Sequence, residues 1–134
     1  MRTTAFVLLA LLCACTPRQS AESQGGVTLS VSPGAVSAGD SVTLTLHNGT
    51  AADVGYNLCS SGLERESAGA WEVVPSERVC TRELRILGAG AEGSYSLRLP
   101  VELAPGRYRF LTTAQRMEAG GAAAVRSDPF VVRP

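Results

Sequence analysis

The sequence predicts an all-β sandwich of about 7–8 antiparallel strands. Apolar and polar residues alternate in short runs from Val27 onward, which is the period of a strand with one buried face. Glycine, proline and asparagine separate these runs at short intervals, as turns do in a sandwich. A helix over residues 114–124 is the one helical alternative, and Gly120 and Gly121 argue against it.

Two strands are predicted in the first part of the domain. Residues 27–31 alternate, and the turn residues 33–34, proline and glycine, end the run. Residues 42–47 form the most regular run, in which every second residue is apolar. Asn48 and Gly49 follow and predict a tight turn, because both residue types tolerate a positive φ.

The middle of the chain is predicted to form a hairpin. Its first strand covers residues 54–59 and continues at 63–66, and residues 67–70 supply the turn. Residues 71–74 return as the second strand. Pro75 ends that strand, because proline cannot donate a ladder hydrogen bond.

Later runs complete the predicted sandwich. Residues 79–87 and 94–99 alternate, and residues 107–110 do so directly after a Pro-Gly turn. Residues 113–123 are interpreted as a long loop of small residues, and residues 125–132 as the closing strand. The inward-facing residues expected from these runs are Leu84, Ile86, Tyr95, Leu97, Leu99, Tyr108 and Phe110.

The N-terminus has the composition of an export signal. Arg2 precedes an apolar run that is too short to span a bilayer. The sequence L-C-A-C at residues 12–15 resembles the bacterial lipobox, in which a leucine and two small residues precede an acylated cysteine. Cys15 fits that position better than Cys13, which would put bulky Leu12 where a small residue belongs. An ordinary signal that ends in cysteine is the alternative.

The lipobox resemblance implies a division of the chain. Residues 1–14 would be the signal peptide, residues 15–26 a flexible tether carrying lipid, palmitate included, on Cys15, and residues 27–134 the folded domain. The protein would then lie in the bacterial cell envelope, held to the membrane by its lipid. Thr16 stands where an aspartate would retain a lipoprotein at the inner membrane, so the outer membrane is favoured in a Gram-negative cell.

The same division leaves two cysteines to pair. One of the four cysteines leaves with the signal and one carries lipid, so Cys59 and Cys80 remain. An oxidising compartment favours a disulfide between them, and a ring of this size contributes about 3 kcal/mol to stability. Only 21 positions separate them, with Trp71 between. We therefore expect a local staple that closes the hairpin around Trp71, and not the inter-sheet bridge of antibody domains.

Charge excludes one class of partner. The twelve basic residues, all arginine, are balanced by twelve acidic residues. A balanced chain lacks the positive field that attracts nucleic acid, so no nucleic-acid partner is expected. Arg107 and Arg109 on one strand, with Arg78, Arg82 and Arg85 after the hairpin, form either an anion-binding patch or a solubilising surface.

Four segments of the domain resemble bacterial immunoglobulin-like domains of small envelope lipoproteins. They are V-T-L-T-L-H-N, G-Y-N-L-C, L-E-R-E-S-A-G-A-W-E-V-V-P and L-A-P-G-R-Y-R-F, all between Val42 and Phe110. The resemblance implies an immunoglobulin-like sandwich and carries no catalytic residues with it. Tyr108 either forms a tyrosine corner, with its hydroxyl bound to upstream backbone, or is an ordinary core tyrosine.

The residues offer little catalytic chemistry. His47 is the single histidine and sits at an outward position, so neither a serine triad nor a zinc or copper site is expected. Glu64 and Glu66 share one strand face, where they either share a proton or a calcium ion, or form a solvated face with Arg65. We expect no metal, no cofactor and no enzymatic activity.

The function expected is a non-catalytic binding or structural module with an envelope protein as its partner. The expected recognition surface is the loop carrying Gln115, Arg116, Met117 and Glu118, because sandwich loops present binding residues on a rigid scaffold. A mobile connection is the alternative for this loop. The alternative function is an immunoglobulin-fold proteinase inhibitor that inserts such end loops into a protease.

Overall fold

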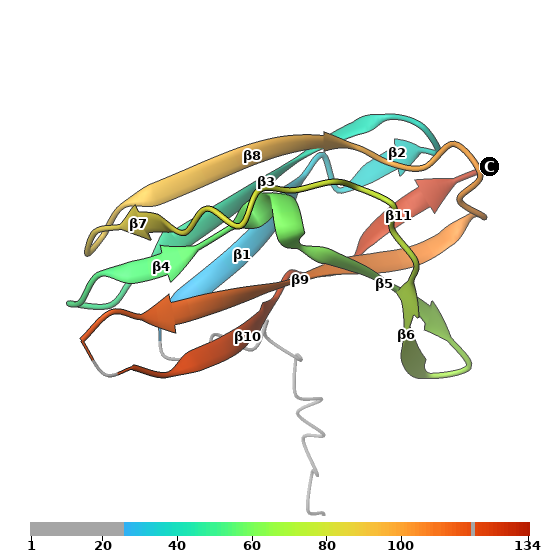
Figure 1. Cartoon of the computed structure of the whole chain (residues 1–134). Helices are drawn as coiled ribbons and strands as arrows, with labels where there is room; N and C mark the ends of the chain where they lie inside the picture. The colour runs from blue at the N-terminus through green and yellow to red at the C-terminus, as the bar shows by residue number, and fades with distance from the viewer. Residues whose placement is uncertain (1–25, 119) are drawn as a thin grey trace, which may run out of the picture.

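The computed structural model describes residues 26–118 and 120–134, and these residues form a two-layered all-β sandwich. Figure 1 shows the layers, with β8, β3 and β1 on one side and the sheet containing β9 on the other. The strands are β1 Val27–Ser32, β2 Ala35–Ser37, β3 Ser41–Asn48, β4 Val54–Tyr56, β5 Gly62–Ser67, β6 Ala70–Val74, β7 Arg85–Leu87, β8 Glu92–Arg98, β9 Gly106–Arg116, β10 Ala122–Arg126 and β11 Phe130–Arg133, and one 3-10 helix, η1, covers Leu58–Ser60.

These strands make two sheets, and the long strand β9 is the centre of the larger one. The smaller sheet has the order β1-β3-β8, and the larger has the order β2-β11-β9-β4-β7. In the larger sheet, β10 also pairs with β9, and β5 pairs with both β9 and β6. β4 and β5 both pair with one side of β9, and β10 and β11 both pair with its other side. If each of these two couples is counted as one interrupted strand, the sandwich has about eight strand positions. The predicted all-β sandwich is confirmed.

One pairing departs from the antiparallel expectation. The first strand divides at the predicted turn: β1 pairs with β3 in the smaller sheet, and β2 pairs in parallel with β11 in the larger sheet. Residues 33–34 separate the two parts, and the peptide bond before Pro33 is cis. The division ties the two sheets together at their edge.

The core fills the space between the sheets with the alternating residues that the sequence indicated. Val42, Leu44 and Leu46 of β3 are at most 1% exposed. The ring of Phe110 stacks on Phe130, with 5.6 Å between centroids. Aromatic pairs of this geometry stabilise a core beyond the area that they bury.

Tyr108 forms the tyrosine corner. It is 1% exposed, and its hydroxyl donates a 2.6 Å hydrogen bond to the carbonyl oxygen of Ala104. We expect Tyr108→Phe to lower the free energy of unfolding by about 1 kcal/mol, since it leaves that carbonyl without its partner and keeps the ring. Urea denaturation measures the change, with Tyr95→Phe as the control because Tyr95 is 36% exposed. Equal losses in the two variants would contradict a stabilising corner.

The prediction for residues 79–87 was wrong in extent and in face. Only Arg85–Leu87 is a strand, and Leu84 and Ile86 are 45% and 52% exposed. Leu87 lies opposite Val54 and takes the buried position, which turns Ile86 outward opposite Gly55. A shift of one residue in the alternation exchanges the two faces of a strand.

The prediction of a long loop over residues 113–123 was also wrong. β9 continues to Arg116 and forms a hairpin with β10, in which Thr112 lies opposite Val125. Thr112 and Ala114 are buried. These small inward residues fit the space between the sheets, and their low hydrophobicity concealed the period of two.

Candidate functional site: the groove beside strand β8

A segment without regular structure crosses the open side of the sandwich. We call residues 75–84 the strap, which runs as an extended trace from β6 to β7 (Figure 1). Pro75 starts it, because its missing N–H cannot continue the β5–β6 ladder.

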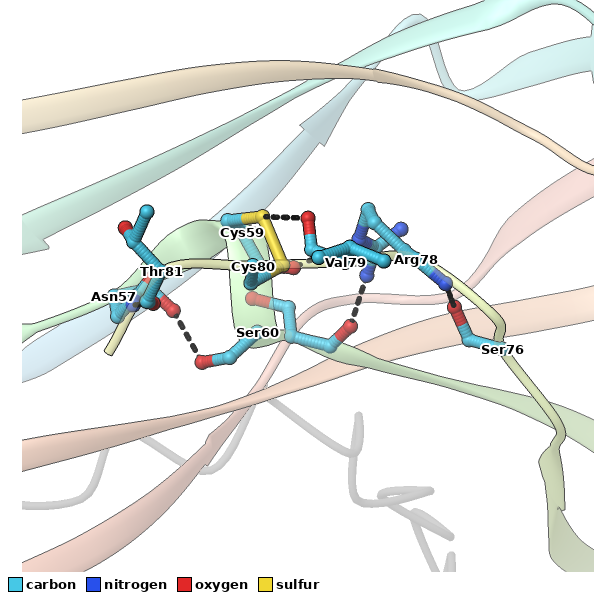
Figure 2. Close-up of a disulfide and its surroundings, with 9 residues drawn as sticks. Asn57, Cys59, Ser60, Ser76, Arg78, Val79, Cys80 and Thr81 are labelled. Atoms are coloured by element: carbon cyan, nitrogen blue, oxygen red, sulfur yellow. Dashed lines mark hydrogen bonds between the residues drawn. A yellow bond between two sulfur atoms is a disulfide. The ribbon is translucent and has the colours of Figure 1, made fainter. Parts of the chain in front are cut away.

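The strap is fastened to the segment around η1 (Figure 2). The Cys59–Cys80 disulfide joins them, and the Nδ2 atom of Asn57 donates to the carbonyl oxygen of Thr81 at 2.8 Å. Arg78 donates from Nε to the carbonyl oxygen of Cys59 at 2.7 Å and from Nη2 to that of Ser61 at 2.6 Å. All of these bonds hold the strap to the segment between β4 and β5.

The predicted disulfide is confirmed, and it is local. Its ring contains the β5–β6 hairpin, as expected, and does not bridge the two sheets. Trp71 takes no part in the strap's fastening. Its ring lies 4.2 Å from the guanidinium carbon of Arg109, on the outer face of the larger sheet.

A groove of about 740 Å³ opens between the strap and β8. Its apolar lining includes Leu63, Leu97, Leu99 and Phe110, all of which belong to the buried core. Next to it, a hollow of about 300 Å³ lies against the disulfide, and Tyr95 lines both spaces. The groove therefore gives a bound group access to core side chains, as in many ligand sites.

Two observations describe the rim of this groove. Val101 and Val79, which line the groove and the smaller hollow, are 72% and 94% exposed. Glu77 and Glu102 line the groove as well, and neither has an ion-pair partner among the described residues. The arrangement suits an apolar or amphipathic ligand, which would cover these exposed apolar side chains.

The two predicted carboxylates do not form a shared site. Glu64 accepts a 2.6 Å hydrogen bond from Nε of Arg109, and Glu66 accepts a 2.7 Å hydrogen bond from Nη1 of Arg107. Arg65, the expected partner, instead donates to the carbonyl oxygen of Pro105 and lies over the Tyr108 ring. The register of β5 and β9 puts Glu64 opposite Arg109, so cross-strand pairing decides these partners.

Of the other sequence-predicted residues, Arg78 lines the groove and Arg85 the smaller hollow, whereas the expected recognition loop and His47 lie away from both. Gln115 and Arg116 end β9, and Met117 and Glu118 belong to the turn that follows. His47 is half-buried on β3, opposite Thr28 and Glu92. In residues 26–118 and 120–134, no three His, Cys, Asp or Glu side chains are grouped to hold a metal ion.

Cys15 and the predicted lipid site lie outside the described residues. Within the described part, no helix is long and apolar enough to cross a membrane.

The groove itself was missed by the sequence analysis. The available signal was the pair of facts that Pro75 ends a strand and that Cys80 pairs with Cys59. Together they indicate that the chain returns toward residue 59 after Pro75, and the structure shows that it does so without joining a sheet.

Comparison with known proteins adds no family. No family model matches the chain, and no curated protein matches it. The chain is similar to part of the alkylpurine DNA glycosylase AlkC of Pseudomonas fluorescens, bound to DNA, at 18% identity and a TM-score of 0.40, over 77% of this chain and 30% of that one. It is also similar to part of a β-glucosidase of Listeria innocua, at 19% identity and a TM-score of 0.33, over 79% of this chain and 16% of the enzyme. The chain thus spans less than a third of either enzyme, and at these scores neither likeness bears on function.

Proposed function

We propose that this protein is an exported, lipid-anchored and non-catalytic envelope protein whose sandwich binds a segment of another envelope protein in the groove beside β8. The observation that carries this proposal is the groove of about 740 Å³, lined by core residues and held open by a disulfide-fastened strap. A bound apolar segment would remove the exposed side chain of Val101 from water. Burial of apolar surface is the main favourable term in such association.

The anchoring part of the proposal is supported by the L-C-A-C sequence at residues 12–15. We expect Cys15→Ser to abolish incorporation of labelled palmitate and to release the protein from the membrane fraction. Cys13→Ser is the matched control and should remain labelled and membrane-bound. Labelling that survives Cys15→Ser would contradict the assignment of Cys15.

The binding part can be tested with two positions of equal exposure. Val101 lines the groove and is 72% exposed, whereas Val73 lies outside it on β6 and is 74% exposed. A photo-crosslinking residue at Val101 of the full chain, activated in intact cells, is expected to give one discrete adduct with an envelope protein. The same residue at Val73 should not give that adduct. Identical adduct patterns at the two positions, or none at Val101, would contradict binding in the groove.

The β9–β10 hairpin favours a second candidate, the proteinase inhibitor. Its turn presents Met117, which is 44% exposed, at the end of a paired strand. A paired hairpin holds such a side chain in place better than a free loop does. Inhibition of papain-like or subtilisin-like enzymes by the domain, lost in Met117→Gly, would support it. Full protease activity at excess inhibitor would exclude it.

A further inference from the structure

Strand β8 has an open edge. It pairs with β3 on one side, and among the described residues no strand pairs with its other side. Among the described residues, the strap forms no hydrogen bond with β8, and its side-chain hydrogen bonds join it to residues 57–61. The backbone groups on that edge have no strand partner in the described part of the chain, and the groove and the smaller hollow separate them from the strap and η1.

The side chains of β8 leave this edge uncovered. Ser94 and Ser96 turn toward β3, where their hydroxyls lie 3.0 Å and 2.9 Å from those of Thr45 and Thr43. The strand is seven residues long and contains neither proline nor lysine, the residues that natural proteins often use to block an edge. Consecutive residues from Tyr95 to Glu102 also line the groove, which shows that the edge itself borders open space.

The sequence of β8, E-G-S-Y-S-L-R, is complementary to itself in the antiparallel direction. When two copies are centred on Tyr95, Glu92 of each lies opposite Arg98 of the other. Glu92 has no ion-pair partner among the described residues, and Arg98 uses only Nε, in a 2.7 Å hydrogen bond to the carbonyl oxygen of Gly39. Opposite charges placed directly across two strands attract, and like charges repel.

The same register matches the remaining residues. Ser94 of one copy lies opposite Ser96 of the other, and the two Tyr95 side chains lie opposite one another on the inner face. Tyr95 is 36% exposed in the single chain, and aromatic cross-strand pairs stabilise antiparallel strands. A different segment of polypeptide would match this order of charges only by coincidence, whereas a second copy of β8 places an opposite charge at both ends of the paired strands.

We propose that the protein forms a symmetric dimer in which the β8 strands of two copies pair antiparallel about Tyr95. The two three-stranded sheets then become one sheet of twice the width, closed by a two-fold axis. The pairing uses Tyr95 to Arg98, which also line the groove, so the second copy would occupy the β8 side of the groove.

Charge exchange tests the pairing on the full chain in detergent, by analytical ultracentrifugation. Glu92→Arg and Arg98→Glu each place like charges opposite one another at both ends, so each is expected to weaken the dimer by about tenfold or more. A mixture of the two variants restores both ion pairs in a mixed dimer, as does the double variant in a dimer of its own. A monomeric parent at all concentrations, or a dimer that neither single variant weakens, would overturn the proposal.

A cysteine at the axis tests the register. Tyr95→Cys puts two thiols opposite one another, so oxidation is expected to join two copies covalently. Ser94→Cys is the control, because Ser94 lies opposite Ser96, and it should join copies only when mixed with Ser96→Cys. Joining by Ser94→Cys alone, or attachment of Tyr95→Cys to a different protein in place of a second copy, would overturn the proposal. Because Tyr95 to Glu102 line the groove, a second copy paired at β8 would take up part of it, and the crosslinker at Val101 separates the two proposals by what it captures. An adduct with a second copy supports the dimer, and an adduct with a different envelope protein supports the groove proposal.

Discussion

Replacing Asn48 by alanine is expected to lower the free energy of unfolding by about 3 kcal/mol or more, because it leaves several buried polar groups without partners. Asn48 is 0% exposed. Its Nδ2 atom donates to the carbonyl oxygens of Ala52 at 2.8 Å, Leu87 at 3.0 Å and Gly88 at 3.1 Å. Its Oδ1 atom accepts from the backbone N–H and the hydroxyl of Thr50, at 3.0 Å and 2.6 Å. One side chain thus joins the end of β3 to the end of β7 in the other sheet and to the loop that leads into β4.

Chemical denaturation of the variant measures this loss as a lower midpoint, and the dependence of the unfolding free energy on denaturant concentration should stay the same. The control is Asn57→Ala, which removes a single exposed hydrogen bond to Thr81 and should cost well under half as much. Asn48→Asp keeps the acceptor oxygen and loses the donor, so it should be as damaging as alanine. If Asn48→Ala and Asn57→Ala unfold at the same denaturant concentration, the side chain does not hold the sheets in this way.

Removing the disulfide, by Cys59→Ala together with Cys80→Ala, is expected to lower the free energy of unfolding by about 3 kcal/mol. The bridge closes a ring across 21 positions of separation, so its loss gives the unfolded chain more conformations. The strap also loses one of its fastenings beside the groove. Denaturation of the double variant and of the oxidised parent measures the difference, and the protein should stay in the membrane fraction, because the change leaves Cys15 in place.

Arg78→Ala, introduced into the oxidised parent and into the double cysteine variant, separates the effect of fastening the strap from the effect of closing the disulfide ring. Its guanidinium also ties the strap to the η1 segment, through the carbonyl oxygens of Cys59 and Ser61. If the disulfide acts on the folded strap as well as on the unfolded chain, the cost of Arg78→Ala should differ between the two backgrounds. Equal midpoints for the oxidised parent and the double cysteine variant would remove the stabilising role of the bridge altogether.

Much of the fold could be predicted because alternation is local. The runs through β3 and the start of β9 identified Leu44, Leu46, Tyr108 and Phe110 as core residues, and all four are buried. Where the inward residues were small, as at Ala114, the signal was too weak to distinguish a strand from a loop. At Ile86 the alternation was correct and the face was wrong, because Leu87 competes for the same buried space.

The candidate site was harder to predict than the core. The sequence predicts that Cys59 and Cys80 pair in a local bridge, and the structure confirms that bridge. It does not show that the bridge would hold the strap across from β8, since that depends on which strands flank each sheet. Asn48 was interpreted as a turn residue tolerant of positive φ, yet neither it nor Gly49 adopts one. The side chain of Asn48 instead donates a hydrogen bond to the carbonyl oxygen of Leu87, 39 positions away along the chain.

By itself, the sequence determined the all-β class, the alternating core, the tyrosine corner as one of two readings, and the cysteine pair, because each depends on residues close together in the chain. Only the tertiary structure decided the division of the first strand between sheets, the ion pairs of Glu64 and Glu66 with β9, the groove beside β8 and the open edge of that strand. These depend on the register between distant strands, which is set by the fit of whole faces and is not encoded in any one run of residues.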